Sequence, residues 1–190
     1  DEIGVGTDHA GIIVLPDDAV VGTPAAEYYH LESDWVIDID ITANRADALS
    51  HYGVARDLYA WLVQRGYKTS LHRPDCSRFH VDNNDLPIEV DIENHEACKR
   101  YACLSITDCD VKESPKWLQD KLTVIGLRPI NNIVDITNYI MMAYGQPMHC
   151  FDADMVKGHK IVVRTQPEGT EFITLDGQKH ILGEHDLSIC

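Results

Sequence analysis

The segment from Gly126 to Asp152 is dense in polar side chains whose types could do chemistry. A buried helix cannot hold so many polar groups unpaired and an exposed loop does not need them, so this clustering suggests a site. Helical spacing places Thr137 and Asn138 together at the edge of a packed face, where their polar atoms require partners. His149 follows a helix stop and lies on a constrained loop, where it either acts on a substrate or hydrogen-bonds to the backbone.

A second polar group, Asn44-Arg45-Ala46-Asp47, stands between a predicted strand and a predicted helix. Asn and Asp at such a junction are typical of helix capping, so a structural role is favoured over a functional turn. Arg45 is different, because its guanidinium either ties down backbone carbonyls or reaches a partner. The sequence leaves these two roles of Arg45 open.

The ten histidines and six cysteines invite a metal site, but their spacing does not support one. Neither His-x-x-x-His nor His-x-Glu with a downstream cysteine pair occurs. No glycine-rich loop of the kinds that cradle the phosphates of ATP or NAD is present either. Since the cysteines form no Cys-x-x-Cys pair, we expect reduced thiols in a cytoplasmic protein.

The composition is that of a globular protein, with 190 residues, 44% hydrophobic and 25% charged. Asp and Glu number 31 against 16 Lys and Arg, which gives a formal net charge of -15. This balance argues against a long basic surface, so we expect any nucleic-acid contact to be local. The longest apolar runs fall short of the roughly 20 residues that span a bilayer, so no membrane anchor is expected. No stretch resembles a signal peptide, and both ends of the chain look cut.

Apolar periodicity and stop signals predict four helices. They are a short helix after Pro24, a long one over Ala46 to Arg65, one from Ser114-Pro115 to Gly126 and one over Ile133 to Ala143. In the third, Ser114 is the expected cap and Pro115 the first helical residue. Residues 69–87, with two prolines and no periodicity, are interpreted as a linker.

Strands are expected wherever short apolar or alternating runs stand between turn signals. These runs are Ile12 to Leu15, Trp35 to Ile41, Ile88 to Ile92, Tyr101 to Thr107, Ile161 to Thr165, Glu171 to Leu175 and Gln178 to Leu182. Asp176-Gly177 between the last two is a strong hairpin signal. Because strands and helices mix without regular βαβ units, the fold class is predicted to be α+β, with more than one module.

Several separated blocks of the sequence match one known family. The blocks are TANRADALSHYGVARDLYA, CKRYACLSI, SPKWLQDKL, GLRPINNIVDITNY, QPMHCFD and VVRTQPEGTEFITLDG. Together they resemble the beta subunit of bacterial phenylalanyl-tRNA synthetase, and chance similarity over so many blocks is not credible. The resemblance implies a multi-domain fragment of that subunit, with a partial B3/B4 domain.

The resemblance also implies where the domains lie. Residues 1–33 look like the end of an inserted, OB-type tRNA-binding barrel, and 34–70 like the second part of the helical N-terminal domain. Residues 71–85 are then a linker, and 86–190 the first part of the B3/B4 editing domain. The implied partners are the phenylalanine-specific tRNA and the alpha subunit, in an alpha2-beta2 assembly. Amino-acid activation with ATP and magnesium belongs to that full enzyme, so none is expected in this fragment.

In the family, the B3/B4 domain hosts post-transfer editing, the hydrolysis of tyrosine wrongly esterified to the phenylalanine tRNA. The residues implied for this pocket match Arg128, Thr137, Asn138, Pro147 and His149 in this sequence. His149, Thr137 and Asn138 would be catalytic, orienting or deprotonating a water and holding it or the substrate amine. Arg128 would bind the terminal ribose-phosphate and Pro147 would line the wall. Whether His149 is a base or only a positioning group stays open.

Two other functions compete with editing. In the family the domain continues past the position of Cys190 to a glutamate that recognises the tyrosine hydroxyl, so the pocket here is expected to be incomplete. A purely architectural segment, holding tRNA and alpha subunit without chemistry, is therefore an alternative. An independent RNA-binding module is disfavoured by the net charge of -15. The presence of all four polar pocket residues favours editing.

Overall fold

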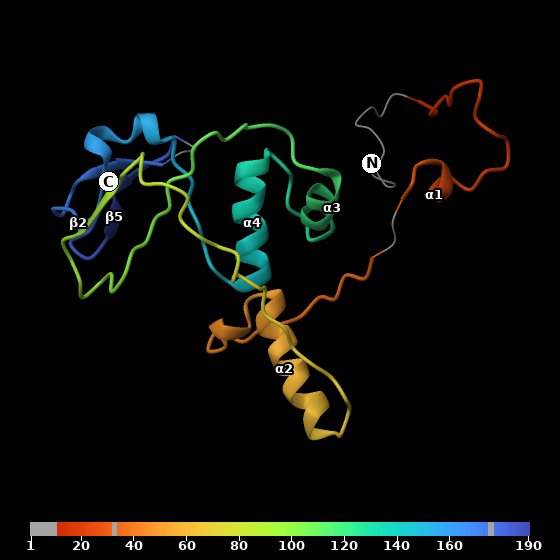
Figure 1. Ribbon diagram of the computed structural model, residues 1–190, viewed down its shortest axis with the longest axis horizontal. Helices are drawn as coiled ribbons and strands as arrows, with labels where there is room; N and C mark the ends of the chain where they lie inside the picture. Colours follow the sequence, from red (N-terminus) through yellow and green to blue (C-terminus); the bar gives the residue numbers. More distant parts are fainter. Residues whose placement is uncertain (1–10, 32–33, 175–176) are drawn as a thin grey trace. The chain divides into compact units, whose positions relative to one another are not determined.

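Two units make up the chain, Asp1–Asp40 and Ile41–Cys190 (Figure 1). The computed structural model describes residues 11–31, 34–174 and 177–190. The described residues of the first unit contain one short helix, α1 (Ala25–Tyr28), which confirms the helix predicted after Pro24. The other helices and all the strands of the described residues belong to the second unit.

Two strands expected near the start of the chain are not formed. Residues 12–15 and 35–41 have no strand structure, and their apolar side chains are open to solvent, with Ile12 93% and Trp35 92% exposed. A strand needs a neighbour to bond its backbone, and no described segment pairs with either run. Alternation of apolar residues alone was therefore a misleading signal at both places.

The helix predicted over Ala46 to Arg65 is present but broken near its start. A 3₁₀ turn, η1 (Ala46–Ala48), precedes α2 (His51–Gln64). The hydroxyl of Ser50 caps α2 by accepting a hydrogen bond from the backbone N–H of Gly53 at 2.9 Å. Gly53 is buried, and a β-carbon there would collide with the carbonyl oxygen of Asp47. Glycine at this position is what lets η1 lie against α2.

The predicted helix over Ile133 to Ala143 is confirmed as α4 (Asn132–Tyr144). Its N-cap is Asn131, whose side-chain oxygen accepts from the backbone N–H groups of Ile133 and Val134 at 3.1 and 3.0 Å. At the other end, Gly145 has a φ of 74°, a left-handed conformation that favours glycine and stops the helix.

The third predicted helix is present as α3 (Lys116–Val124), but Ser114 does not cap it and Pro115 is not its first residue. Pro115 takes the N-cap position, and the buried Ser114 hydroxyl instead donates to Oδ2 of Asp135 at 2.5 Å. The other oxygen of Asp135 accepts from the backbone N–H of Ile130 at 2.9 Å. Asp135 is 0% exposed, so the need of a buried carboxyl group for hydrogen-bond partners outweighed the local capping preference of Ser114.

Three strands form one small sheet in the order β1-β2-β5. β1 (Glu89–Ile92) runs parallel to β2 (Lys160–Thr165), with Glu89 opposite Lys160. β5 (Leu187–Ile189) runs antiparallel on the other side of β2. β3 (Glu171–Ile173) and β4 (Lys179–Ile181) make a separate antiparallel hairpin. Two 3₁₀ turns, η2 (Ala153–Met155) and η3 (Lys157–His159), precede β2.

Most of the strands predicted for this unit are confirmed. β1, β2, β3 and β4 lie where they are expected, although Leu175 of a predicted strand and Asp176 of the predicted turn are outside the described residues. The strand predicted over Tyr101 to Thr107 is wrong, because the segment has no described partner and exposes Leu104 and Ile106. β5 was missed, since a run of three residues is too short to show a periodicity.

The buried apolar side chains of the described residues are few. They are Ala48 from η1, Leu118 and Leu122 from α3, and Ile161 and Val163 from β2. The helices and mixed sheets confirm the α+β class, and residues 69–87 contain no helix or strand, as expected of a linker. Within the described segments, none of the helices combines the length and apolar content that crossing a bilayer requires.

Removing the buried Asp135 side chain tests how much it contributes to the stability of the fold. Asp135→Ala leaves the Ser114 hydroxyl and the Ile130 N–H unpaired in the interior, so the free energy of unfolding should fall by about 3 kcal/mol. Urea denaturation followed by circular dichroism measures this. Asp120→Ala is the matched control, because Asp120 is exposed on α3, where it pairs with Lys116. It should cost less than about 0.5 kcal/mol, and equal losses for the two variants would contradict the role given to Asp135.

Candidate functional site

Arg128 lies on the short loop between α3 and α4. The hydrogen bond from the Ile130 N–H to the buried Asp135 fixes the end of this loop against α4. Arg128 itself is exposed and lines a cavity of about 330 Å³. The rest of the cavity wall comes from Thr123, Gly126, Leu127 and Pro129. A guanidinium held at the edge of a cavity can meet an anionic group such as a phosphate.

Thr137 and Asn138 occupy consecutive positions near the middle of α4, and both are half-buried. The hydroxyl of Thr137 donates to the backbone carbonyl of Val134 at 2.7 Å. The expectation that this polar atom needs a partner is met within the helix itself. The lone pairs of the same hydroxyl can still accept a hydrogen bond from an ammonium group or a water.

Pro147 and His149 lie on the loop that follows Gly145, and both are exposed. The His149 ring is 6.2 Å from the ring of Phe151, tilted by 33°. No hydrogen bond joins the His149 imidazole to the backbone within the described part of the chain. The exposed imidazole therefore does not brace the loop through a hydrogen bond to the described backbone.

The candidate pocket residues lie on three different segments around α4. Arg128 precedes α4, Thr137 and Asn138 lie on it, and His149 follows it. The cavity beside Arg128 is lined by none of the other three. Their convergence on one concave surface stays a prediction.

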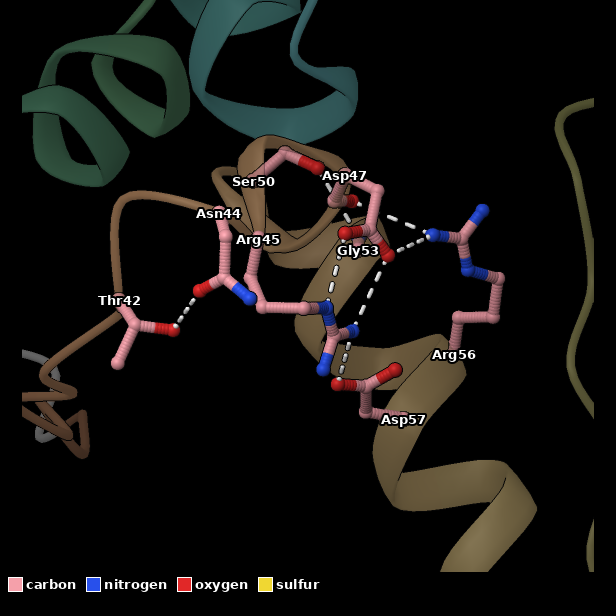
Figure 2. Close-up of polar contacts among 8 residues, drawn as sticks. All are labelled: Thr42, Asn44, Arg45, Asp47, Ser50, Gly53, Arg56 and Asp57. Carbon is pink, nitrogen blue, oxygen red and sulfur yellow. Dashed lines mark hydrogen bonds and ion pairs between the residues drawn. The ribbon is translucent and has the colours of Figure 1, made fainter.

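The most complete polar network surrounds Arg45, and Figure 2 shows its guanidinium between two carboxylates. Arg45 Nε lies 2.9 Å from Oδ1 of Asp47, and Nη2 lies 2.6 Å from Oδ2 of Asp57. Nη2 of Arg56 reaches Oδ2 of Asp47 at 2.6 Å. In the preceding turn, the Thr42 hydroxyl donates to Oδ1 of Asn44 at 2.7 Å. Arg45 thus binds carboxylates of its own chain, neither of the two roles that the sequence left open.

The ion pairs of this network shift the pKa values of Asp47 and Arg45. The hydrogen bond from Arg45 lowers the pKa of Asp47 to about 2. The nearby charges of Arg45 and Arg56 act in the same direction, and desolvation opposes them. The two carboxylates in turn raise the pKa of Arg45. The formal charges of the two arginines and the two aspartates of this network sum to zero. Because all four side chains are nearly half exposed, each pair contributes little stability, and the main effect is to order η1 against α2.

Sequence reasoning missed the residues that hold these parts in place. Asp135 carried one usable signal, an acid between apolar residues of a predicted helix, which indicates a buried and paired carboxylate. Arg56 and Asp57 carried a weaker one, as adjacent opposite charges on the helix that follows Arg45 and Asp47. For metals, the described segments contain no group of three or more His, Cys, Asp or Glu placed to hold an ion. All six cysteines lie in described segments and are free thiols.

The sequence is similar along its whole length to several known proteins. Over all 190 residues the chain is 62% identical to the phenylalanine–tRNA ligase beta subunit of Bacteroides fragilis, and 61% identical to that of Bacteroides thetaiotaomicron. It is 43% identical to the beta subunit of Salinibacter ruber over 194 aligned positions. The chain corresponds to a segment of phenylalanine–tRNA ligase beta subunits. It spans 23% of the length of each of these three relatives and is itself covered in full.

The sequence profile of the B3/4 domain matches residues 97–190. This range includes the loop of Arg128, all of α4 and the loop of His149. The Arg45 network lies outside the matched range. The resemblance drawn from the sequence blocks is therefore confirmed at the level of the family and of this domain.

The depressed pKa of Asp47 predicts how this carboxyl titrates. In the folded chain its midpoint should lie near pH 2, below the usual 3.8, so its stabilising effect is present above about pH 4 and is lost as the pH falls towards 2. Arg45→Gln should return the midpoint towards 3.8, because Arg45 is the largest cause of the shift. NMR titration of the carboxyl carbon measures both.

Arg56→Gln is the matched control for that titration, since it removes the same charge from the other side of Asp47. It should raise the midpoint less than Arg45→Gln, because its hydrogen bond and charge are lesser causes. A larger rise with Arg56→Gln would contradict the assignment of Arg45 as the main partner.

Proposed function

We propose that this chain supplies part of the editing hydrolase of phenylalanine–tRNA ligase, which removes tyrosine wrongly esterified to the phenylalanine tRNA. The observation that carries the proposal is the B3/4 match over residues 97–190. All the residues named for the pocket fall within it: Arg128, Thr137, Asn138, Pro147 and His149. Identity of 62% along the whole chain to a beta subunit supports the same assignment.

Ester hydrolysis needs an oriented water, a group to take its proton and donors for the oxyanion that forms. In the proposal, His149 orients or deprotonates the water, because its exposed imidazole is not tied to the backbone of the described residues. Thr137 and Asn138 hold the water or the substrate amine from the half-buried face of α4. Arg128 binds the terminal ribose-phosphate from a loop fixed by Asp135, and Pro147 lines the wall.

The domain assignments belong to the same proposal. Residues 1–33 are the end of an OB-type barrel, 34–70 part of the helical N-terminal domain, 71–85 a linker and 86–190 the first part of the editing domain. The partners are the phenylalanine-specific tRNA and the alpha subunit, within a cytoplasmic enzyme. Activation of phenylalanine with ATP and magnesium is assigned to the full two-subunit enzyme.

An architectural segment without chemistry is the second candidate. It is favoured by one observation, that the cavity beside Arg128 receives no side chain from Thr137, Asn138 or His149. The Arg45 network, which orders a turn against a helix, is also of a structural kind. A measurement of editing decides between the two candidates.

His149→Ala in the two-subunit enzyme should slow the deacylation of mischarged tyrosyl-tRNA by about 10²-fold or more, the size of effect typical of general-base catalysis. Charging with phenylalanine should stay nearly unchanged, because that reaction is assigned to the other subunit.

His185→Ala is the matched control for this substitution, because the His185 side chain is 93% exposed and lies outside the proposed pocket. It should leave deacylation unaltered. Deacylation that is equally fast in the His149 variant would remove His149 from the mechanism and favour the architectural candidate.

A further inference from the structure

A second cavity, of about 320 Å³, lies where α2, α4 and the segment after α2 meet. In Figure 1 the yellow segment that leaves α2 turns back towards the junction of α2 and α4. Tyr52 comes from α2, Tyr144 from the end of α4, and Arg73 from the returning segment. The ring nitrogen Nδ1 of His51 donates to the carbonyl oxygen of Met142 at 3.0 Å, which ties the two helices together.

Aromatic rings and guanidinium groups dominate the chemistry of this cavity. The rings of Tyr52 and Tyr144 lie 6.1 Å apart at an angle of 43°. The guanidinium carbon of Arg73 is 5.8 Å from the centre of the Tyr52 ring, and its Nε donates to the Tyr52 hydroxyl at 3.2 Å. Tyr52 thereby holds Arg73 at the cavity by two contacts.

The charges around the cavity leave one cation unmatched. Arg56 and Asp47 also line it, but Asp47 is already neutralised within the Arg45 network. Arg73 has no carboxylate partner within the described segments, and its two terminal nitrogens carry no hydrogen bond there. In a chain with a net charge of -15, a cavity with an excess positive charge stands out as a site for an anion.

We propose that this cavity binds one nucleotide of an RNA strand, with the phosphate on Arg73 and the base against the tyrosine rings. Tyrosine faces stack on bases of unpaired RNA, and the guanidinium group suits a phosphate. The volume of about 320 Å³ is at the lower end of the range for small-ligand pockets, about 300 to 1,000 Å³. Arg73 and Tyr144 are exposed, so a strand can continue out of the cavity. This inference stands on the cavity and does not depend on the proposed editing reaction.

The test measures binding of a fluorescein-labelled hexa-adenylate RNA to the 190-residue chain by anisotropy, at low salt. Arg73→Gln should weaken binding about tenfold or more, and should lower the slope of log K against log salt by about 0.7, the value for one phosphate contact on a single strand. Tyr52→Leu should weaken binding about tenfold through lost stacking. Arg78→Gln is the matched control, because it removes the same charge from the same segment without lining the cavity. It should change affinity less than about twofold.

Competition with unlabelled ligands separates the possible sources of the phosphate. AMP should displace the RNA with an affinity at least about tenfold weaker than that of hexa-adenylate, and inorganic phosphate should be weaker still. AMP binding as tightly as the RNA would overturn the assignment to an RNA strand, and equal displacement by inorganic phosphate would overturn the assignment to a nucleotide. Equal losses for Arg73→Gln and Arg78→Gln would overturn the site itself. Should Tyr52→Leu fail to fold by circular dichroism, the exposed pair Arg73 and Arg78 still decides the outcome.

Discussion

A single buried side chain, that of Asp135, ties the segments that precede α3 and α4 to α4 itself. Its two oxygens accept from the Ser114 hydroxyl before α3 and from the Ile130 N–H before α4. Because no water reaches this group, neither donor can be replaced by solvent, and both segments must keep their place relative to α4. The loop of Arg128 and the helix of Thr137 and Asn138 consequently share one fixed point.

The helix α4 is common to both sites described above. Its middle carries Thr137 and Asn138, and its last residue, Tyr144, reaches the cavity beside α2. Caps at Asn131 and Gly145 define both of its ends, so the distance along the helix between the two sites is fixed. A chain that combines an editing pocket with a nucleotide site would need such a rigid connection between them.

Local sequence signals were sufficient to predict that the helices exist. The strands were harder to predict, because a strand also needs a partner from elsewhere in the chain. α4 was predictable because its cap residue and its terminal glycine stand in the sequence at the right spacing. Tyr101 to Thr107 alternates as well as β2 does, yet only β2 has partners in the structure, and partners are not visible in a local window. Asp135 shows the same limit, because its donors at Ser114 and Ile130 are set by tertiary packing. The candidate editing residues came from resemblance, since their residue types alone left function and structural support both open.

The parallel pairing of β1 with β2 has a consequence for the order of folding. Glu89 meets Lys160 in the sheet, and the chain between them contains α3, α4 and both loops that carry candidate residues. Closing so long a loop costs chain entropy before any strand contact repays it, whereas α3 and α4 are neighbours in sequence. We therefore expect the helical pair to form early and the sheet late. Slow strand closure, rather than helix formation, would then set the time at which this unit becomes complete.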